Sequence, residues 1–138
     1  LEIREIPLDP SHIPLVSASI ITTHKWAQAH PEQARAVVKA TTDAMNAIAA
    51  DPQIAIDATK PWDDSLASED SLASANAVLA ATVPLWLGTS GHATGMQDLT
   101  TWAQMVTFLD SLGELEGPVD PASVATNDYV SPAEEPQS

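Results

Sequence analysis

The sequence predicts a mostly helical segment of α/β type, with about five helices and one or two short strands. Residues 15–22 are rich in β-branched side chains and nearly free of charge, which is typical of a strand covered on both faces. Residues 31–50 then place apolar side chains at helical spacing, which predicts a long amphipathic helix. Alanine supplies much of the 44% hydrophobic content while aromatic residues make up 4%, and this composition favours closely packed helices.

Both predicted strands lie near the start of the chain. Residues 2–8 carry two isoleucines among charges, which predicts a short edge strand that ends at Pro7. A connector over residues 11–14 leads to the second strand, residues 15–22. Because that strand shows no alternation of polar and apolar residues, we expect it to lie inside a sheet.

Two helices are predicted before residue 51. The first spans residues 22–29, with Thr22 or Thr23 as its N-cap and Trp26 turned inward. The second begins at Pro31 and ends near Ala50, about five turns later. Its predicted inward face consists of Ala34, Val37, Val38, Thr41, Met45 and Ile48.

A third and a fourth helix are predicted between residues 51 and 86. Asp51 and Pro52 cap the third, which ends before Lys60–Pro61. Ser68 is the predicted N-cap of the fourth, which Pro84 should kink or end. The apolar positions are Ile54, Ala55 and Ala58 in the third helix and Leu72, Ala75, Leu79 and Val83 in the fourth.

The last helix follows a glycine-rich loop. Residues 88–95, GTSGHATG, predict a loop with positive-φ positions, and Asp98 then caps a fifth helix that stops before Gly113. After residue 113 we expect an irregular run with one short turn, and residues 131–138 have the composition of a disordered tail. The predicted packing face of the fifth helix is Trp102, Met105, Val106, Leu109 and Leu112.

The charge balance excludes several classes of partner. Five Lys and Arg residues against nineteen Asp and Glu residues give a formal charge of −14, which repels phosphate backbones, so we expect no nucleic-acid partner. The chain has no cysteine, which excludes disulfides and thiolate chemistry. It has no run of 18 apolar residues, so we expect no membrane span within it.

No catalytic or metal-binding motif is recognisable. The four histidines include no i, i+4 pair on one predicted helix, and HExxH, GxSxG and the phosphate-binding glycine motifs are absent. We therefore expect no metal site, no cofactor and no enzyme activity. His92 stands in the glycine-rich loop, where its ring could donate a hydrogen bond to a ligand, although a solvated loop histidine is the commoner arrangement.

The order of these segments resembles one protein family. The quoted stretches are VSASIITT, HKWAQAHPEQARAVVKATTDAMNAIAADPQIAID, VLAATVPLW, GMQDLTTWAQMVTFLDSLGEL and TNDYV. In this order they resemble the C-terminal part of substrate-binding proteins of ABC importers, in the group that binds thiamine pyrimidine precursors, riboflavin, nitrate, sulfonates and taurine. The resemblance covers roughly residues 2 to 130.

The resemblance implies a two-lobed α/β parent fold, the type II periplasmic binding protein, closing over a small ligand. Residues 1–8 would end the second lobe as an edge strand, residues 9–15 would form the hinge crossover, and residues 16–130 would be the C-terminal contribution to the first lobe. Ligand contacts in the family cluster where the strand leaves the hinge, often with an aromatic-glycine-asparagine sequence. The matching positions here are Val16, Ser17 and Ala18, and with the neighbouring Ser19 they offer hydroxyl and backbone groups instead.

The expected function is therefore ligand binding and delivery to ABC permease subunits, without chemistry. We expect a periplasmic or extracellular address, with a lipid anchor on an N-terminal region outside this chain as one arrangement. Two alternatives stay open: a pyrimidine-precursor synthase of the same fold, and a helical protein-interaction module. Because a strand as apolar as residues 15–22 needs sheet neighbours, we expect its partner to be a missing N-terminal half or a second copy of the chain.

Overall fold

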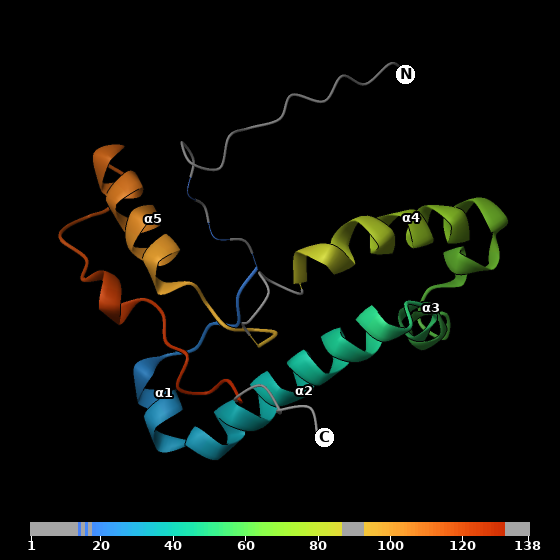
Figure 1. Cartoon of the computed structure of the whole chain (residues 1–138), viewed down its shortest axis with the longest axis horizontal. Coiled ribbons are helices and arrows are strands. Elements are labelled where there is room, and N and C mark those ends of the chain that lie inside the picture. Colours follow the sequence, from blue (N-terminus) through green and yellow to red (C-terminus); the bar gives the residue numbers. More distant parts are fainter. Residues whose placement is uncertain (1–13, 15, 17, 87–92, 132–138) are drawn as a thin grey trace, which may run out of the picture. The chain divides into compact units, whose positions relative to one another are not determined.

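A computed structural model describes residues 14, 16, 18–86 and 93–131, and these residues are mostly helical (Figure 1). They contain five α-helices, two short 3₁₀ helices and no β-strand. The predicted number of helices is therefore confirmed. The helices are α1 (His24–Ala29), α2 (Pro31–Ala50), α3 (Gln53–Thr59), α4 (Glu69–Trp86) and α5 (Leu99–Ser111), with η1 (Asp64–Ala67) and η2 (Pro121–Ser123) as the 3₁₀ helices.

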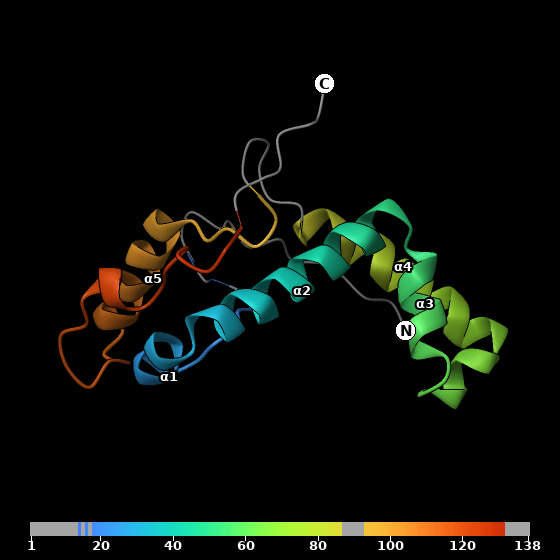
Figure 2. The same cartoon turned by 90° about the horizontal axis from the view of Figure 1, so that it is seen from below.

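The structure divides into two compact units. Unit 1 combines the residues up to Thr22 with Gln97–Asp128, and therefore contains α5 and η2. Unit 2 combines Thr23–Met96 with the residues from Tyr129 onward, and contains α1 to α4 with η1. In unit 2, α2 and α4 pack together and run in opposite directions (Figures 1 and 2).

The predicted strand is wrong for the residues that the structure describes. Val16 and residues 18–22 have no regular secondary structure, and Ile21 is 89% exposed where burial was expected. A strand needs a neighbouring strand to accept and donate its backbone hydrogen bonds, and the described residues contain no such neighbour. The predicted edge strand at residues 1–8 lies outside the described residues, as do residues 9–13 of the predicted hinge crossover and residues 132–138 of the predicted tail.

Helices α1 and α2 begin at the predicted signals. The Thr23 hydroxyl accepts the N–H of Trp26, and Pro31 occupies the first turn of α2. The side chains of Ala27 and Ala34 are buried near this junction. Trp26 is exposed instead of turned inward, and its ring lies 5.2 Å from that of His30.

The predicted inward face of α2 is partly wrong. Ala34 is buried and Val38, Met45 and Ile48 are half-buried, whereas Val37 and Thr41 are exposed. The Thr41 hydroxyl turns back onto its own helix, where it donates to the Val37 carbonyl oxygen.

The predicted apolar stripe of α3 is partly wrong, because Ala55 is half-buried as expected but Ile54 and Ala58 are exposed. Asp51 does cap the helix, because its carboxylate accepts the N–H of Gln53 at 3.0 Å. The buried residue, however, is Ile56 at 2% exposure, while Ile54 is 44% exposed and Ala58 is also exposed. A helix of only two turns has too few apolar positions to define one face from spacing alone.

Helix α4 begins at its predicted cap, since the Ser68 hydroxyl accepts the N–H of Ser71. Its predicted inward positions are half-buried, and Val83 is buried. The helix continues past Pro84 to Trp86, which is tolerated because a proline in the last turn removes a single intrahelical hydrogen bond. η1, which precedes α4 and packs on it, was not predicted.

Helix α5 follows its predicted signals at both ends. Asp98 accepts the N–H groups of Thr100 and Thr101, and Gly113 adopts a φ of 73° in the left-handed region. Val106 is buried, and Trp102, Met105 and Leu109 are half-buried as expected. Leu112 is exposed, which corrects its place on the packing face: it is the C-cap, beyond the last helical turn.

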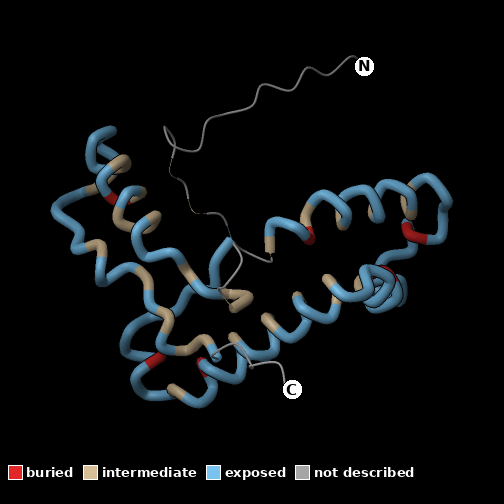
Figure 3. Tube along the Cα trace, viewed as in Figure 1, coloured by how far each residue is buried: buried red, intermediate tan, exposed pale blue. Residues whose placement is uncertain are grey.

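Few side chains are buried in the described residues. Six are, all of them apolar, and none of the large ones is completely removed from solvent (Figure 3). Five of the six lie in unit 2 and one, Val106, in unit 1. The list is Ala27, Ala34, Ile56, Leu66, Val83 and Val106.

Candidate functional site

Three of the five predicted ligand-contact residues lie in described positions. Val16 is half-buried, and its backbone N–H points at the Met105 Sδ atom of α5 at 3.4 Å. Ala18 and Ser19 are exposed. Ser17 and His92 lie outside the described residues.

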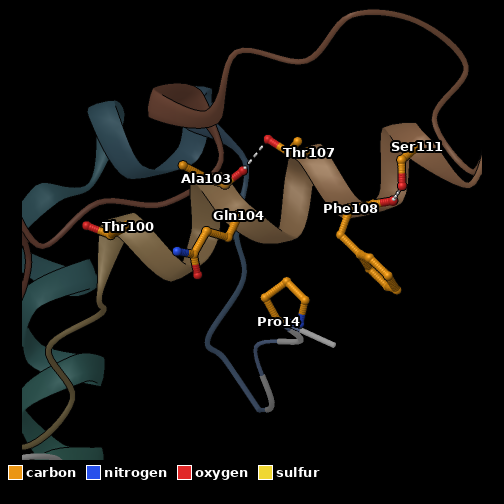
Figure 4. Close-up of a pocket in the computed structure, with 7 residues that line it drawn as sticks. All are labelled: Pro14, Thr100, Ala103, Gln104, Thr107, Phe108 and Ser111. Atoms are coloured by element: carbon orange, nitrogen blue, oxygen red, sulfur yellow. Dashed lines mark hydrogen bonds between the residues drawn. The ribbon is translucent and has the colours of Figure 1, made fainter. Parts of the chain in front are cut away.

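An open groove in unit 1 is lined by Pro14 and α5. It encloses about 430 Å³ between Pro14 and one face of α5. Figure 4 shows the Pro14 ring facing the middle of the helix, opposite Gln104 and Phe108. The lining residues are Pro14, Thr100, Ala103, Gln104, Thr107, Phe108 and Ser111.

The groove offers polar contacts without an ionisable group among its lining residues. The Thr107 hydroxyl donates to the Ala103 carbonyl oxygen at 3.0 Å, and the Ser111 hydroxyl donates to the Phe108 carbonyl oxygen at 2.7 Å (Figure 4). Both hydroxyl oxygens therefore remain available as acceptors, while the Gln104 amide can both donate and accept. This combination suits binding of a small molecule with an apolar body and a few polar atoms.

Two hydrogen bonds between the Asn127 carboxamide and the Gln97 backbone fix the start of α5. The Gln97 N–H donates to Asn127 Oδ1 at 2.8 Å, and Asn127 Nδ2 donates back to the Gln97 carbonyl oxygen at 3.0 Å. The Trp102 indole N–H also donates to Gln97 Oε1 at 2.9 Å. These partly buried bonds join the segment after η2 to the residues before α5, and so position the groove-lining face of the helix.

Asp98 anchors the first turn of α5 by charge-assisted hydrogen bonds. The Thr100 N–H lies 2.8 Å from Asp98 Oδ1, and the Thr101 hydroxyl lies 3.0 Å from Oδ2. These bonds, that from the Thr100 N–H first, hold the pKa of Asp98 below its ordinary value of 3.8. The carboxylate is thus the stable form at the helix N-terminus.

The end of the glycine-rich loop is attached to α2. Thr94 donates a 2.6 Å hydrogen bond to Asn46, and Gly95 adopts a φ of 87°, which confirms a positive-φ position in this loop. A Cβ at Gly95 would lie 2.5 Å from Thr42 Cγ2. Gly95 therefore meets two requirements at once, a left-handed backbone and a close approach to α2.

Within residues 14, 16, 18–86 and 93–131, no group of three His, Cys, Asp or Glu side chains is placed to hold a metal ion. In the same residues, no helix is long and apolar enough to cross a membrane.

Comparisons with protein families, curated proteins and solved structures found no match to this chain. The site therefore has to be judged on its own geometry.

The structure brings together only part of what the sequence suggested. It places Val16 against α5, but it leaves Ala18 and Ser19 away from the groove lining. Sequence reasoning missed the groove because the Thr-rich side of α5 has the pattern of a solvated face. The available signal was the spacing of Thr100, Gln104, Thr107 and Ser111, which share one side of a helix.

Proposed function

We propose that this chain forms part of the substrate-binding component of an ABC importer and binds a small organic molecule, such as a thiamine pyrimidine precursor, for delivery to permease subunits. The chain would contribute to one lobe of a two-lobed α/β protein that works outside the cytoplasm. The proposal rests on the ordered resemblance of its segments and on one structural observation. Pro14, which belongs to the segment that the resemblance assigns to the hinge crossover, lines the groove on α5, and the Val16 N–H reaches Met105 of the same helix.

The lining of the groove favours reversible binding over chemistry. Its polar atoms are hydroxyls and one amide, and it contains no side chain that titrates near neutral pH. Phe108 and Pro14 supply apolar surface for the flat part of a ligand. Neither a metal nor a cofactor is part of the proposal.

The test is isothermal titration calorimetry on the longest natural form of the protein that contains these residues. The ligands are a thiamine pyrimidine precursor, riboflavin, taurine and nitrate. Ala103→Trp fills the groove and should therefore displace the ligand. We expect binding to weaken at least about tenfold, which corresponds to a loss of about 1.4 kcal/mol of binding free energy or more. Ala36→Trp on the exposed side of α2 is the matched control and should leave affinity unchanged.

Two results would remove the proposal. One is that none of the four ligands binds. The other is that a ligand binds with the same affinity to the Ala103→Trp variant, which would place its site away from the groove.

A second candidate function, a helical protein-interaction module, is favoured by exposed apolar surface. Thirteen large hydrophobic side chains of the described residues are exposed, against six buried hydrophobic residues. Large apolar side chains left in water are typical of surfaces that a partner covers. Sedimentation velocity of the 138-residue chain tests this function, because a folded monomer that binds no other protein contradicts it.

A further inference from the structure

The outward side of α4 is apolar, although it faces solvent. From Ser71 to Trp86 this helix contains no charged residue. Val78 is 63% exposed and Leu85 is 79% exposed, while the opposite side packs inward through Leu79 and Val83. A helix that is apolar on both sides is normally covered on both. We define the outer α4 face by its exposed residues at helical spacing, Ser74, Ala77, Val78, Ala81 and Leu85.

One end of this face is acidic. Asp63 precedes η1 and Asp64 begins it, while Glu69 and Asp70 lie in the first turn of α4. All four side chains are exposed. No Lys or Arg occurs from residue 61 to residue 86. Glu69 and Asp70 therefore put two carboxylates at the N-terminal end of α4, and η1, which packs on α4, begins with Asp64. A partner that covers this face must therefore bring positive charge to that end.

Trp62 lies just before Asp63, the N-cap of η1, and is 88% exposed. The backbone N–H of Trp62 donates to the Thr59 carbonyl oxygen, which holds the backbone at the end of α3. Asp63 directly follows Trp62 in the chain. An exposed indole beside carboxylates is a favourable surface for a Lys or Arg side chain, which can lie over the ring while it pairs with the acids. Tryptophan is also the residue type most enriched among the residues that dominate binding energy at interfaces.

We propose that the outer α4 face binds an amphipathic helix of another protein, with an apolar stripe along the face and Lys or Arg residues at the end near Trp62. This inference rests on the second candidate function, the interaction module, and is independent of ligand binding in the groove. A second copy of this chain is a poor occupant, because its net charge of −14 repels the acidic end.

The probe is a fluorescein-labelled, 18-residue helical peptide with a Leu and Ala stripe and four Lys residues at one end, and fluorescence anisotropy measures its binding to the 138-residue chain. Val78→Asp should weaken binding at least about tenfold, because it puts a charge in the centre of the face. Trp62→Ala should weaken it about threefold or more, as should raising the salt concentration to 0.5 M.

A charge exchange tests the orientation of the charges. The double variant Glu69→Lys with Asp70→Lys should bind the Lys peptide at least about fivefold more weakly and should gain affinity for a peptide with Glu in place of Lys. Val119→Asp, at an exposed valine in unit 1, is the matched control and should not change affinity. Circular dichroism of each variant verifies that the helices are retained, and Leu85→Asp serves in place of Val78→Asp if that variant unfolds.

Four results would overturn the inference. They are no binding of the Lys peptide, equal binding by a peptide whose stripe is replaced by Ser, no effect of Val78→Asp and Leu85→Asp, and no exchange of preference in the charge-reversed variant. Sedimentation separates this failure from that of the interaction module. If the chain self-associates through other residues, the interaction module stands and only the basic-helix partner is rejected. If the chain is a monomer that binds neither peptide, both proposals are rejected.

Discussion

Replacing Gly95 with alanine tests how the end of the glycine-rich loop is attached to α2. Gly95 has a φ of 87°, and the added Cβ would lie 2.5 Å from Thr42 Cγ2, well inside the 3.5 to 4.0 Å separation of carbon atoms in contact. Gly95→Ala therefore imposes both backbone strain and a steric overlap. The hydrogen bond from Thr94 to Asn46 must adjust to relieve this strain and overlap.

The expected loss can be worked from these two terms. A left-handed conformation costs an L-residue roughly 1–2 kcal/mol, and an extra methyl group in a filled space costs about 1–3 kcal/mol. The smaller conformational entropy of the unfolded alanine chain offsets about 0.4–1 kcal/mol. The free energy of unfolding should therefore fall by about 1–4.6 kcal/mol.

Urea unfolding followed by circular dichroism measures this loss. Thr42→Ser removes the methyl group that the new Cβ meets, and it keeps a hydroxyl that can still donate to the Lys39 carbonyl oxygen. In the Thr42→Ser background, the steric cost is removed, and the backbone cost less the unfolded-state offset should leave a loss of about 1.6 kcal/mol or less. The reasoning is refuted if Gly95→Ala is as stable as the wild type, or if Thr42→Ser leaves its cost unchanged.

Three further predictions concern burial, charge and the hydrogen bonds between Asn127 and Gln97. Ile56→Ala should lower the free energy of unfolding by about 2–5 kcal/mol and Ile54→Ala by about 0.5 kcal/mol or less, as measured by urea unfolding; equal losses would contradict the assigned burial. The lowered pKa of Asp98 stabilises the fold above pH 3.8, and this contribution is lost as the pH falls through the folded value. The difference in melting temperature between the wild type and Asp98→Asn should therefore shrink on acidification, and a pH-independent difference would exclude this role. Asn127→Ala removes both hydrogen bonds to Gln97 and should cost about 1–3 kcal/mol, with Asn127→Asp intermediate; unchanged hydrogen exchange at the Gln97 amide would contradict the pairing.

The helix boundaries were predictable because local chemistry decides them. The hydroxyl of Thr23 and the carboxylates of Asp51 and Asp98 accept N–H groups two or three residues away, whatever the rest of the chain does. Gly113 likewise ends α5 through its own backbone freedom. These contacts span less than one helical turn, so residue order alone reveals them.

The groove and the hydrogen bonds between Asn127 and Gln97 could not be predicted in the same way. Asn127 is thirty residues from Gln97, and Pro14 meets α5 across most of the chain length. The sequence shows which side chains can form hydrogen bonds, but not which distant partner they reach. Ser17 and His92, the other predicted ligand contacts, lie outside the described residues and stay predictions.

By itself, the sequence determined the number of α-helices and most of their ends, the acidic charge and the left-handed glycine positions, because each depends on neighbouring residues. Only the tertiary structure decided that Ile56, and not Ile54, is buried, and that residues 18–22 are exposed without strand pairing. Burial depends on which surface a segment packs against, and strand formation depends on a second strand. The described residues contain no strand that could pair with residues 18–22.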